Sequence, residues 1–416
     1  MSLKSRTASK TEPKAETDAT TVTLTSARVV SQYWNRYRPR SWRQTLRWAC
    51  FTVTVVATAL NPAIAQRLER QIQTAYWEFR GPVSPPSDIV ILAIDDESLS
   101  QGQHYLDDPT RYPELAGISA WPWQRQVYSQ VMQKLFDSGA RAVAIDLVFS
   151  TPSAYGQADD QALADTLRQY GDRVVLATKL GDLELRQGEL LQPTLPLPSL
   201  QATPAHLGII NFGLEPNGQI HQLSDRYLAL VERVEQELTG LPIDEANRLP
   251  SFAEATLRAA GERAIAHQGD HIFFYGPAGT FEQVPFWYVL DADLYASQLD
   301  GGAFFKDKIV LIGSMATLHR DFHAAPFSLT QHYPEALSGV EILANTVATL
   351  QDSRRVQQLP TGISVGVVML GMLAATRVRS HPTTRQLLQR GSWILGGVVF
   401  RVTAGYGLFL GGWLIP

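Results

Sequence analysis

Acidic side chains directly follow two apolar runs that each have the length of a buried β-strand. Asp95, Asp96 and Glu97 come after the first run, and Asp146 lies near the end of the second. Ligands of open parallel sheets bind beyond the carboxyl ends of the strands, so we expect these acids to line one crevice. Clustered carboxylates also suit a hard cation such as Mg²⁺ or Ca²⁺. The competing interpretation is that Asp95 and Asp146 accept hydrogen bonds from loop N–H groups and cap helices.

An aromatic and basic segment lies between the two apolar runs. Trp121, Pro122 and Trp123 are followed by Arg125 at the start of a predicted helix. The two indole rings would form an aromatic wall, and the guanidinium would hold an anionic group of a ligand. The competing interpretation is that the tryptophans pack into the core beside the helix start. The predicted small-molecule site comprises Asp95, Asp96, Trp123, Arg125 and Asp146.

Two histidines near the last predicted strand have a spacing that metal ligands use. His319 and His323 are four residues apart, with Asp321 between them, which fits one face of a helix. Pro326 lies close by and favours a loop instead. A Gly-Ser pair precedes them, but the chain has no phosphate-binding glycine motif. We therefore expect neither a resident metal nor a cofactor.

No residue pattern in the chain requires catalysis. The sequence has one cysteine and neither an HExxH nor a CxxC motif. The aspartates named above are compatible with a metal-assisted phosphohydrolase, but nothing in their spacing demands one. We expect a protein that is not an enzyme, and a membrane-bound phosphohydrolase is the alternative.

The charge is divided unevenly along the chain, although the net charge is only −4. Residues 1–78 hold 12 Lys+Arg and 5 Asp+Glu, and residues 359–416 hold five arginines and no acid. The segment 79–358 holds 19 basic and 35 acidic residues, which is a net −16. An acidic centre repels phosphates, and this excludes nucleic acid as a partner. The basic ends coincide with the long apolar runs, and this indicates a membrane.

Three apolar runs predict transmembrane helices. The run 48–65 has no charge and follows six arginines, and the runs 362–375 and 393–416 enclose a loop with four arginines and no acid. Basic flanks stay in the cytoplasm, so we expect the N-terminus and this loop inside and the domain between them outside. The residues that end the first run also resemble a signal-peptide cleavage site, but the 47 residues before it are too many for an ordinary signal peptide.

The apolar runs divide the chain into membrane and exported parts. Arg401 lies within the third run, and because a charge facing lipid is costly we expect it to contact another helix. Three spans place Pro416 on the exported side. The chain is then either the front part of a longer gene or acts through a separate membrane partner or a second copy of itself. The predicted organisation is a disordered basic cytoplasmic tail at 1–46, transmembrane helices at 47–66, 359–376 and 392–416, a cytoplasmic loop at 377–391, and an exported domain at 67–358.

The exported segment alternates buried strands with amphipathic helices joined by short connections. This order is typical of parallel strands with right-handed crossovers. Cys50 is the only cysteine, so core burial alone must hold the domain together. We therefore predict an α/β fold with a mixed, mostly parallel sheet flanked by helices. The predicted strands are 88–94, 140–148, 173–178, 208–212, 226–231, 271–275 and 308–313, and the predicted helices are 122–138, 159–170, 251–260 and 339–351.

A set of short motifs runs in order along residues 60–416. Together with the flanking spans, this set resembles the type-2 CHASE domain family, the extracytoplasmic sensory domains of bacterial adenylate cyclases, histidine kinases, diguanylate cyclases and Ser/Thr kinases. The motifs are Phe79-Arg80-Gly81-Pro82, Asp95-Asp96-Glu97-Ser98, Trp121-Pro122-Trp123, Asp146-Leu147-Val148-Phe149, Tyr275-Gly276-Pro277, Lys308-Ile309-Val310-Leu311-Ile312-Gly313 and Gly339-Val340-Glu341.

The resemblance implies a sensor in the bacterial inner membrane, with its main domain in the periplasm or outside the cell. It would detect an unknown stimulus or small ligand and pass the signal through its transmembrane helices. The chain departs from the family in two ways: Leu343-Ala344 stands where the family usually has His-Ala, and two spans rather than three follow the sensor, with no output module. A structural envelope protein whose acidic surface binds a basic partner is a further alternative.

Overall fold

The described part of the chain covers the predicted exported domain and a short C-terminal segment. None of the described helices combines the length and the apolar character needed to cross a bilayer. The predicted tail, the cytoplasmic loop, Arg401 and the second predicted span lie outside the described residues. Residues 63–66 of the first predicted span and 402–414 of the third are described, and in the third the helix ends at Leu410 before the short strand Trp413–Leu414. The computed structural model describes residues 63–180, 193–215, 218–225, 227–229, 232–233, 249–262, 269–354, 356–358 and 402–414.

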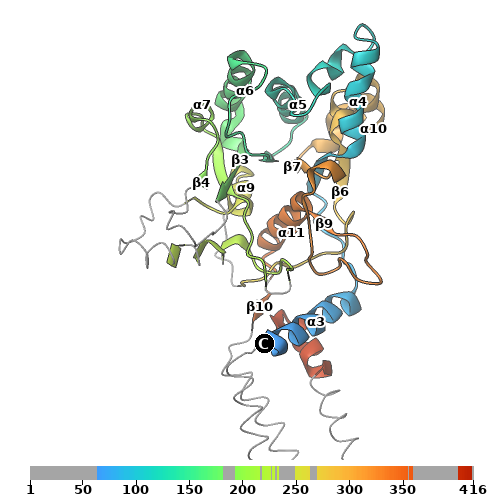
Figure 1. Cartoon of the computed structure of the whole chain (residues 1–416), viewed down its shortest axis with the longest axis vertical. Coiled ribbons are helices and arrows are strands. Elements are labelled where there is room, and N and C mark those ends of the chain that lie inside the picture. The colour runs from blue at the N-terminus through green and yellow to red at the C-terminus, as the bar shows by residue number, and fades with distance from the viewer. Residues whose placement is uncertain are drawn as a thin grey trace, which may run out of the picture.

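A seven-stranded sheet forms the centre of the domain (Figure 1). Its strand order is β4-β3-β2-β7-β1-β6, and β5 also pairs with β3. All neighbours are parallel except β4, which is antiparallel to the end of β3. The predicted α/β fold with a mostly parallel sheet is therefore confirmed. The strands are β1 (Ile89–Ile94), β2 (Ala142–Asp146), β3 (Val174–Leu180), β4 (Pro193–Thr194), β5 (His206–Ile209), β6 (Glu282–Pro285) and β7 (Ile309–Ser314).

Helices cover both faces of the sheet. Alternate residues of each strand point to opposite faces, and this splits the sheet's apolar side chains between two separate clusters. Val90 and Leu92 pack with the helices of one layer, whereas Ile89 and Ile91 pack with those of the other. Both faces are buried, as the continuous apolar runs predict. One layer contains α4 (Asp96–Asp107), α5 (Arg125–Asp137), α6 (Gln157–Tyr170) and α10 (Ala292–Gln298), and the other contains α9 (Phe252–Ala259) and α11 (Gly339–Gln351).

Most predicted elements are confirmed, and two strands are wrong. Residues 227–229 are helical, although 226–231 was expected to be a strand. The segment 271–275 is not a strand apart from one bridge between Gln222 and His271. Its amide groups instead bond to α11, because Asn345 Oδ1 accepts from Tyr275 N and Thr349 Oγ1 accepts from Phe273 N. Side chains of a buried helix thus replace a neighbouring strand as hydrogen-bond partners.

A third hydrophobic cluster forms the end of the domain nearest both predicted membrane connections, and we call it the base cluster. It contains Tyr76 and Trp77 of helix α3 (Ala63–Arg80), Phe274, Ile342 of α11, and Phe409 from the helical residues 402–410. The Trp77 ring meets the Phe409 ring edge to face at 4.9 Å. Figure 1 shows α3 beside the C-terminal helix, at the end away from α4 and α6.

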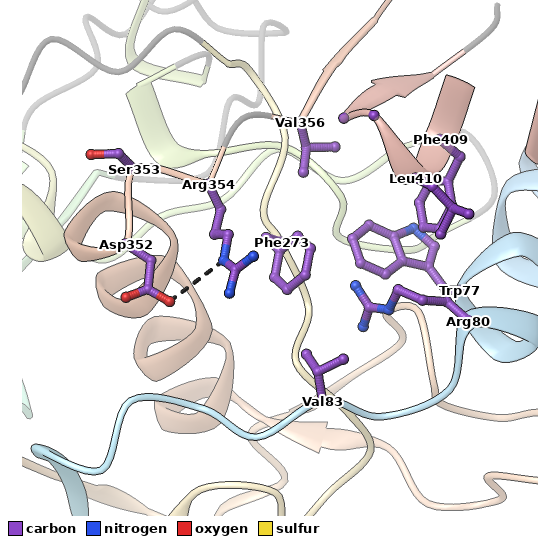
Figure 2. A pocket seen from close by; sticks show the side chains of 12 residues that line it. Trp77, Arg80, Val83, Phe273, Asp352, Ser353, Arg354, Val356, Phe409 and Leu410 are labelled. Atoms are coloured by element: carbon purple, nitrogen blue, oxygen red, sulfur yellow. Dashed lines mark ion pairs between the residues drawn. The ribbon is translucent and has the colours of Figure 1, made fainter. Parts of the chain in front are cut away.

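The C-terminal segment is joined to the domain by backbone as well as by side chains. Strand β11 (Trp413–Leu414) pairs in parallel with β10 (Gln357–Gln358), and Gln357 N donates to Gly412 O at 2.9 Å. The Tyr76 hydroxyl also donates to the carbonyl of Val402 at 3.1 Å. Segments more than 300 residues apart therefore meet at the base cluster. A cavity of about 790 Å³ opens there (Figure 2).

Candidate functional site

The strand register places the predicted carboxylates at one edge of the sheet. Ala93 of β1 and Asp146 of β2 both lie level with Gly313 of the intervening strand β7. Asp95 follows β1 by one residue, so Asp95 and Asp146 flank the same carboxyl edge. In open parallel sheets this is the edge where ligands bind. We call it the carboxyl-edge site.

Asp95 and Asp96 hold the loops of this edge in place. Asp95 is the N-cap of α4, where its Oδ1 accepts from Ser98 N at 2.7 Å. Asp96 accepts from the backbone N and the hydroxyl of Thr317, at 3.0 Å and 2.9 Å. Thr317 belongs to the short loop that follows β7. The capping interpretation is therefore correct for Asp95, and Asp96 ties the start of α4 to the neighbouring loop.

Asp146 has the most perturbed carboxyl group of the site. Burial raises its pKa to about 7, the nearby Asp321 raises the pKa as well, and His323 opposes both effects. A carboxylate in this position can exchange a proton near neutral pH. Perturbed ionisable groups of this kind gather at functional sites, although structural networks also produce them.

The raised pKa of Asp146 predicts that stability falls as pH rises. The unfolded carboxyl titrates near 3.8 and the folded one near 7, so between these values only the folded state keeps the proton. The free energy of unfolding should fall across this window, by at most about 1.4 kcal/mol per pH unit. The free energy of unfolding of Asp146→Asn should not show this decline, and at about pH 8 it should be higher than that of the wild type. Urea unfolding of the full-length chain in detergent measures the profile, and Asp165→Asn at an exposed position is the control. An unchanged profile in Asp146→Asn would contradict this.

The histidines of the loop after β7 join the site, but not as a helical pair. His319 ends a short 3₁₀ helix (Thr317–His319), and His323 belongs to the two-residue strand β8 (Phe322–His323). The interpretation of one helical face is therefore wrong, because the chain turns between them. His319 Nδ1 lies 2.5 Å from Ser314 Oγ, and His323 Nε2 lies 2.9 Å from Asp321 Oδ1. In the described ranges no three His, Cys, Asp or Glu side chains are placed to hold a metal ion.

Trp121 and Trp123 take different places. Trp123 is 3% exposed and packs on Phe286, with ring centroids 4.9 Å apart. Trp121 is partly exposed, and its ring lies 4.3 Å from that of His319. The core-packing interpretation therefore fits Trp123, while Trp121 is the aromatic ring that borders the carboxyl-edge site. Burial lowers the pKa of His319, and the nearby Asp321 and Asp96 carboxylates oppose this shift.

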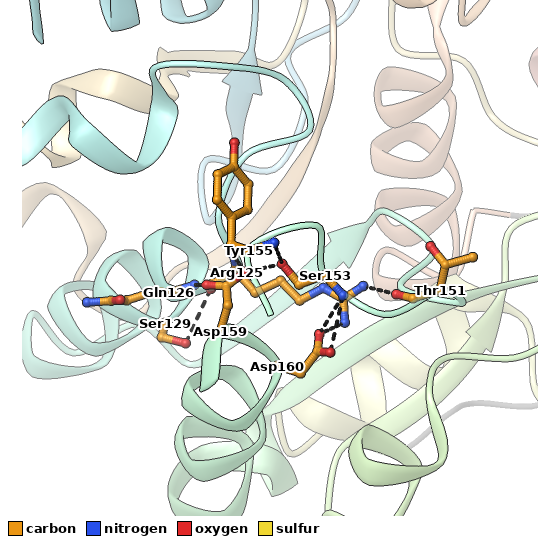
Figure 3. Close-up of polar contacts among 8 residues, drawn as sticks. All are labelled: Arg125, Gln126, Ser129, Thr151, Ser153, Tyr155, Asp159 and Asp160. Atoms are coloured by element: carbon orange, nitrogen blue, oxygen red, sulfur yellow. Dashed lines mark hydrogen bonds and ion pairs between the residues drawn. The ribbon is translucent and has the colours of Figure 1, made fainter. Parts of the chain in front are cut away.

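Arg125 is paired inside the fold rather than turned to the other predicted ligand residues. Its guanidinium donates to Asp160 and to the carbonyl of Thr151. Its backbone N donates to Asp159 Oδ2 at 2.8 Å, and that carboxylate also accepts from Ser153 Oγ. Figure 3 shows these groups converging where α5 and α6 begin. The anion that Arg125 holds is thus a carboxylate of the chain itself.

Helix α11 carries a polar contact that links two motifs far apart in sequence. Ser338 and Glu341 form a capping box at its start. The second oxygen of the buried Glu341 side chain accepts from Gly279 N at 2.7 Å and from Gln283 Nε2 at 2.9 Å. The sequence shows the capping box, but only the fold brings Gly279 and β6 to it.

The same helix runs from the carboxyl-edge site to the base cluster. At its start, Gly339 N donates to Asp321 O, and Val340 packs against Gly313. At its end, Leu350 packs against the base cluster, and Gln351 Nε2 donates to Asp88 Oδ2 at 2.7 Å, just before β1. Thirteen helical residues span about 20 Å. One rigid element therefore contacts both places.

Comparisons with known proteins give one match. Residues 49–377 match the family model of the CHASE2 domain. No curated protein and no solved structure matches the chain.

Proposed function

Because this chain belongs to the CHASE2 domain family, which consists of extracytoplasmic sensory domains, we propose that it is a membrane-anchored sensor of a bacterial inner membrane. Its domain lies in the periplasm or outside the cell, and a small ligand or another stimulus acts at the carboxyl-edge site. The signal passes to the segments that lead into the predicted spans. The chain acts with a separate membrane partner or a second copy of itself, and photo-cross-linking from position 401 tests that contact.

The path of α11 is the observation that supports this proposal most. Its first turn contacts the loop of Asp321 and His323, and Leu350 in its last turn packs against the base cluster. Ile342 of α11 belongs to the same cluster as Trp77 and Phe409. A shift of the start of α11 would therefore change its packing against both α3 and residues 402–410. Packed elements of this kind move as units because interiors are close-packed.

The two alternative functions have less support. A metal-assisted phosphohydrolase needs free carboxylates, but Asp95 and Asp96 already accept hydrogen bonds from Ser98 and Thr317. CHASE2 is also a sensory rather than a catalytic family. A structural envelope protein would use the acidic surface of residues 79–358. That function does not explain the raised pKa of Asp146 or the contacts of α11 with both the carboxyl-edge site and the base cluster.

A cysteine-labelling experiment tests the proposed topology. In a Cys50→Ser background, Leu318→Cys should react with a membrane-impermeant maleimide in intact spheroplasts, because Leu318 is 71% exposed at the carboxyl-edge site. Thr383→Cys, in the predicted cytoplasmic loop, should react only after the membrane is permeabilised. The Cys50→Ser chain alone is the control for background labelling. Labelling of Thr383→Cys but not Leu318→Cys in intact spheroplasts would sink the proposal.

A further inference from the structure

A cavity of about 790 Å³ lies at the base cluster, outside the carboxyl-edge site. Four separate parts of the chain form its walls: the end of α3 with the residues just after it, Phe273, the loop after α11, and residues 409–412. Its apolar walls include Trp77, Phe273 and Phe409. The volume falls in the range of sites that enclose a small organic ligand.

Two arginines face this cavity across one aromatic ring. The guanidinium carbon of Arg80 lies 4.5 Å from the centroid of Phe273, and that of Arg354 lies 5.1 Å from it. Figure 2 shows the two guanidinium groups on either side of that ring. Arg80 donates from Nη2 to Phe274 O at 2.6 Å, but its Nη1 is buried without a hydrogen-bond partner. The Arg80 guanidinium also lies 4.5 Å from the centroid of Trp77, so aromatic rings enclose this cation.

The protein supplies little negative charge to these cations. Among the described residues that line the cavity, the one acid is Asp352. Its Oδ2 accepts from the Tyr275 hydroxyl at 2.7 Å and lies 3.5 Å from Arg354 Nε. Arg80 has no carboxylate partner in the described ranges. Burial lowers the pKa of Arg80 to about 10, and repulsion by Arg354 contributes to this shift. An anion in the cavity lowers this repulsion, and the half-exposed Arg354 is the cation that it can reach.

We propose that this cavity binds a phosphate or carboxylate group carried on an apolar body. The Arg354 guanidinium holds the anionic group, the charge of the enclosed Arg80 adds to the attraction, and Trp77, Phe273 and Phe409 pack on the apolar part. The ligand is either an anionic membrane phospholipid or a soluble amphiphilic anion. The lipid source rests on the proposed function, because it requires the base cluster to face the bilayer. Since Phe409 and Gly412 form one wall, bound ligand also fixes the C-terminal segment against α3.

Ligand-induced thermal stabilisation of the full-length chain tests the site. The chain in non-ionic detergent is titrated with hexyl phosphate and, separately, with inorganic phosphate. Hexyl phosphate should raise the Tm of the wild type with a saturating dependence, and inorganic phosphate should bind more weakly because it lacks the apolar body. Arg354→Gln should weaken the affinity for hexyl phosphate about 10- to 100-fold, the loss expected for a charge-assisted hydrogen bond. Arg354 is half exposed, so this variant should fold.

A matched variant and a lipid arm separate the possible outcomes. Arg111→Gln removes an exposed arginine that also lies over a ring, Tyr112, and it should bind like the wild type. In nanodiscs, phosphatidylglycerol should raise the Tm over phosphatidylcholine in the wild type but not in Arg354→Gln if lipid is the source. If hexyl phosphate binds but phosphatidylglycerol does not raise the Tm, the ligand is a soluble anion. No stabilisation by either probe, or equal stabilisation of Arg354→Gln, overturns the site. The titration in detergent does not depend on membrane topology. Failure of the cysteine-labelling experiment would therefore contradict the proposed function without contradicting the binding site.

Discussion

Asp160→Ala is expected to lower the free energy of unfolding by about 3–5 kcal/mol, because it leaves the Arg125 guanidinium buried without its ion-pair partner. Both side chains are almost fully buried, with 8% and 11% of their surfaces exposed. Burial already lowers the pKa of Arg125, and Asp160 is the main group that opposes this. For a domain of this size the loss corresponds to a Tm lower by on the order of 10 °C. Chemical and thermal unfolding of the full-length chain in detergent measure it.

The pair of Arg168 and Asp165 provides the matched control. It joins the same residue types on the surface of α6, with side chains 48% and 63% exposed. Asp165→Ala should cost less than about 1 kcal/mol, because water already solvates both charges. Added salt should weaken the surface pair and leave the buried one unaffected. If the two alanine variants lose the same stability, Arg125 and Asp160 are not a buried structural pair.

Gly339→Ala is expected to loosen the base cluster at a distance. A Cβ at this position would overlap the Asp321 carboxylate, so either the start of α11 or the Asp321 loop must move. If α11 transmits this shift as one body, amide hydrogen exchange in residues 269–275 and 352–354 should accelerate by about tenfold. The effect would measure the coupling between the carboxyl-edge site and the base cluster that the sensor proposal requires.

A second glycine variant distinguishes coupling from general destabilisation. Gly117→Ala places a Cβ against the Val127 side chain, in the helical layer on the opposite face of the sheet from α11. It should destabilise its own layer and leave exchange at the base cluster close to that of the wild type. A cross-link between Phe79→Cys and Tyr406→Cys, whose rings lie 5.0 Å apart, gives a second readout in a Cys50→Ser background. Equal effects of the two glycine variants at the base cluster would remove α11 as the transmitting element.

The sequence alone determined the strands and helices of the domain where local signals agree. The buried strands at Ile89–Ile94 and Ile309–Ser314 read as uninterrupted apolar runs, because both of their faces are covered. The α11 helix spans Gly339–Gln351, which is the range predicted from the sequence. The alternation of strands and helices predicts that the sheet is mostly parallel, but it does not predict the order of the strands. The motifs also indicated the family, which the match over residues 49–377 confirms.

Only the tertiary structure decided which side chains meet. The partner of Arg125 is Asp160, 35 residues further on, and no local spacing distinguishes that carboxylate from an external anion. Residues 271–275 have strand-like composition but bond to side chains of α11, so a non-local helix decided their structure. The base cluster likewise joins Trp77 to Phe409, and its cavity exists only because α3, the loop after α11 and the C-terminal segment come together. Propensity and periodicity act over a few residues, whereas these contacts depend on how whole elements pack.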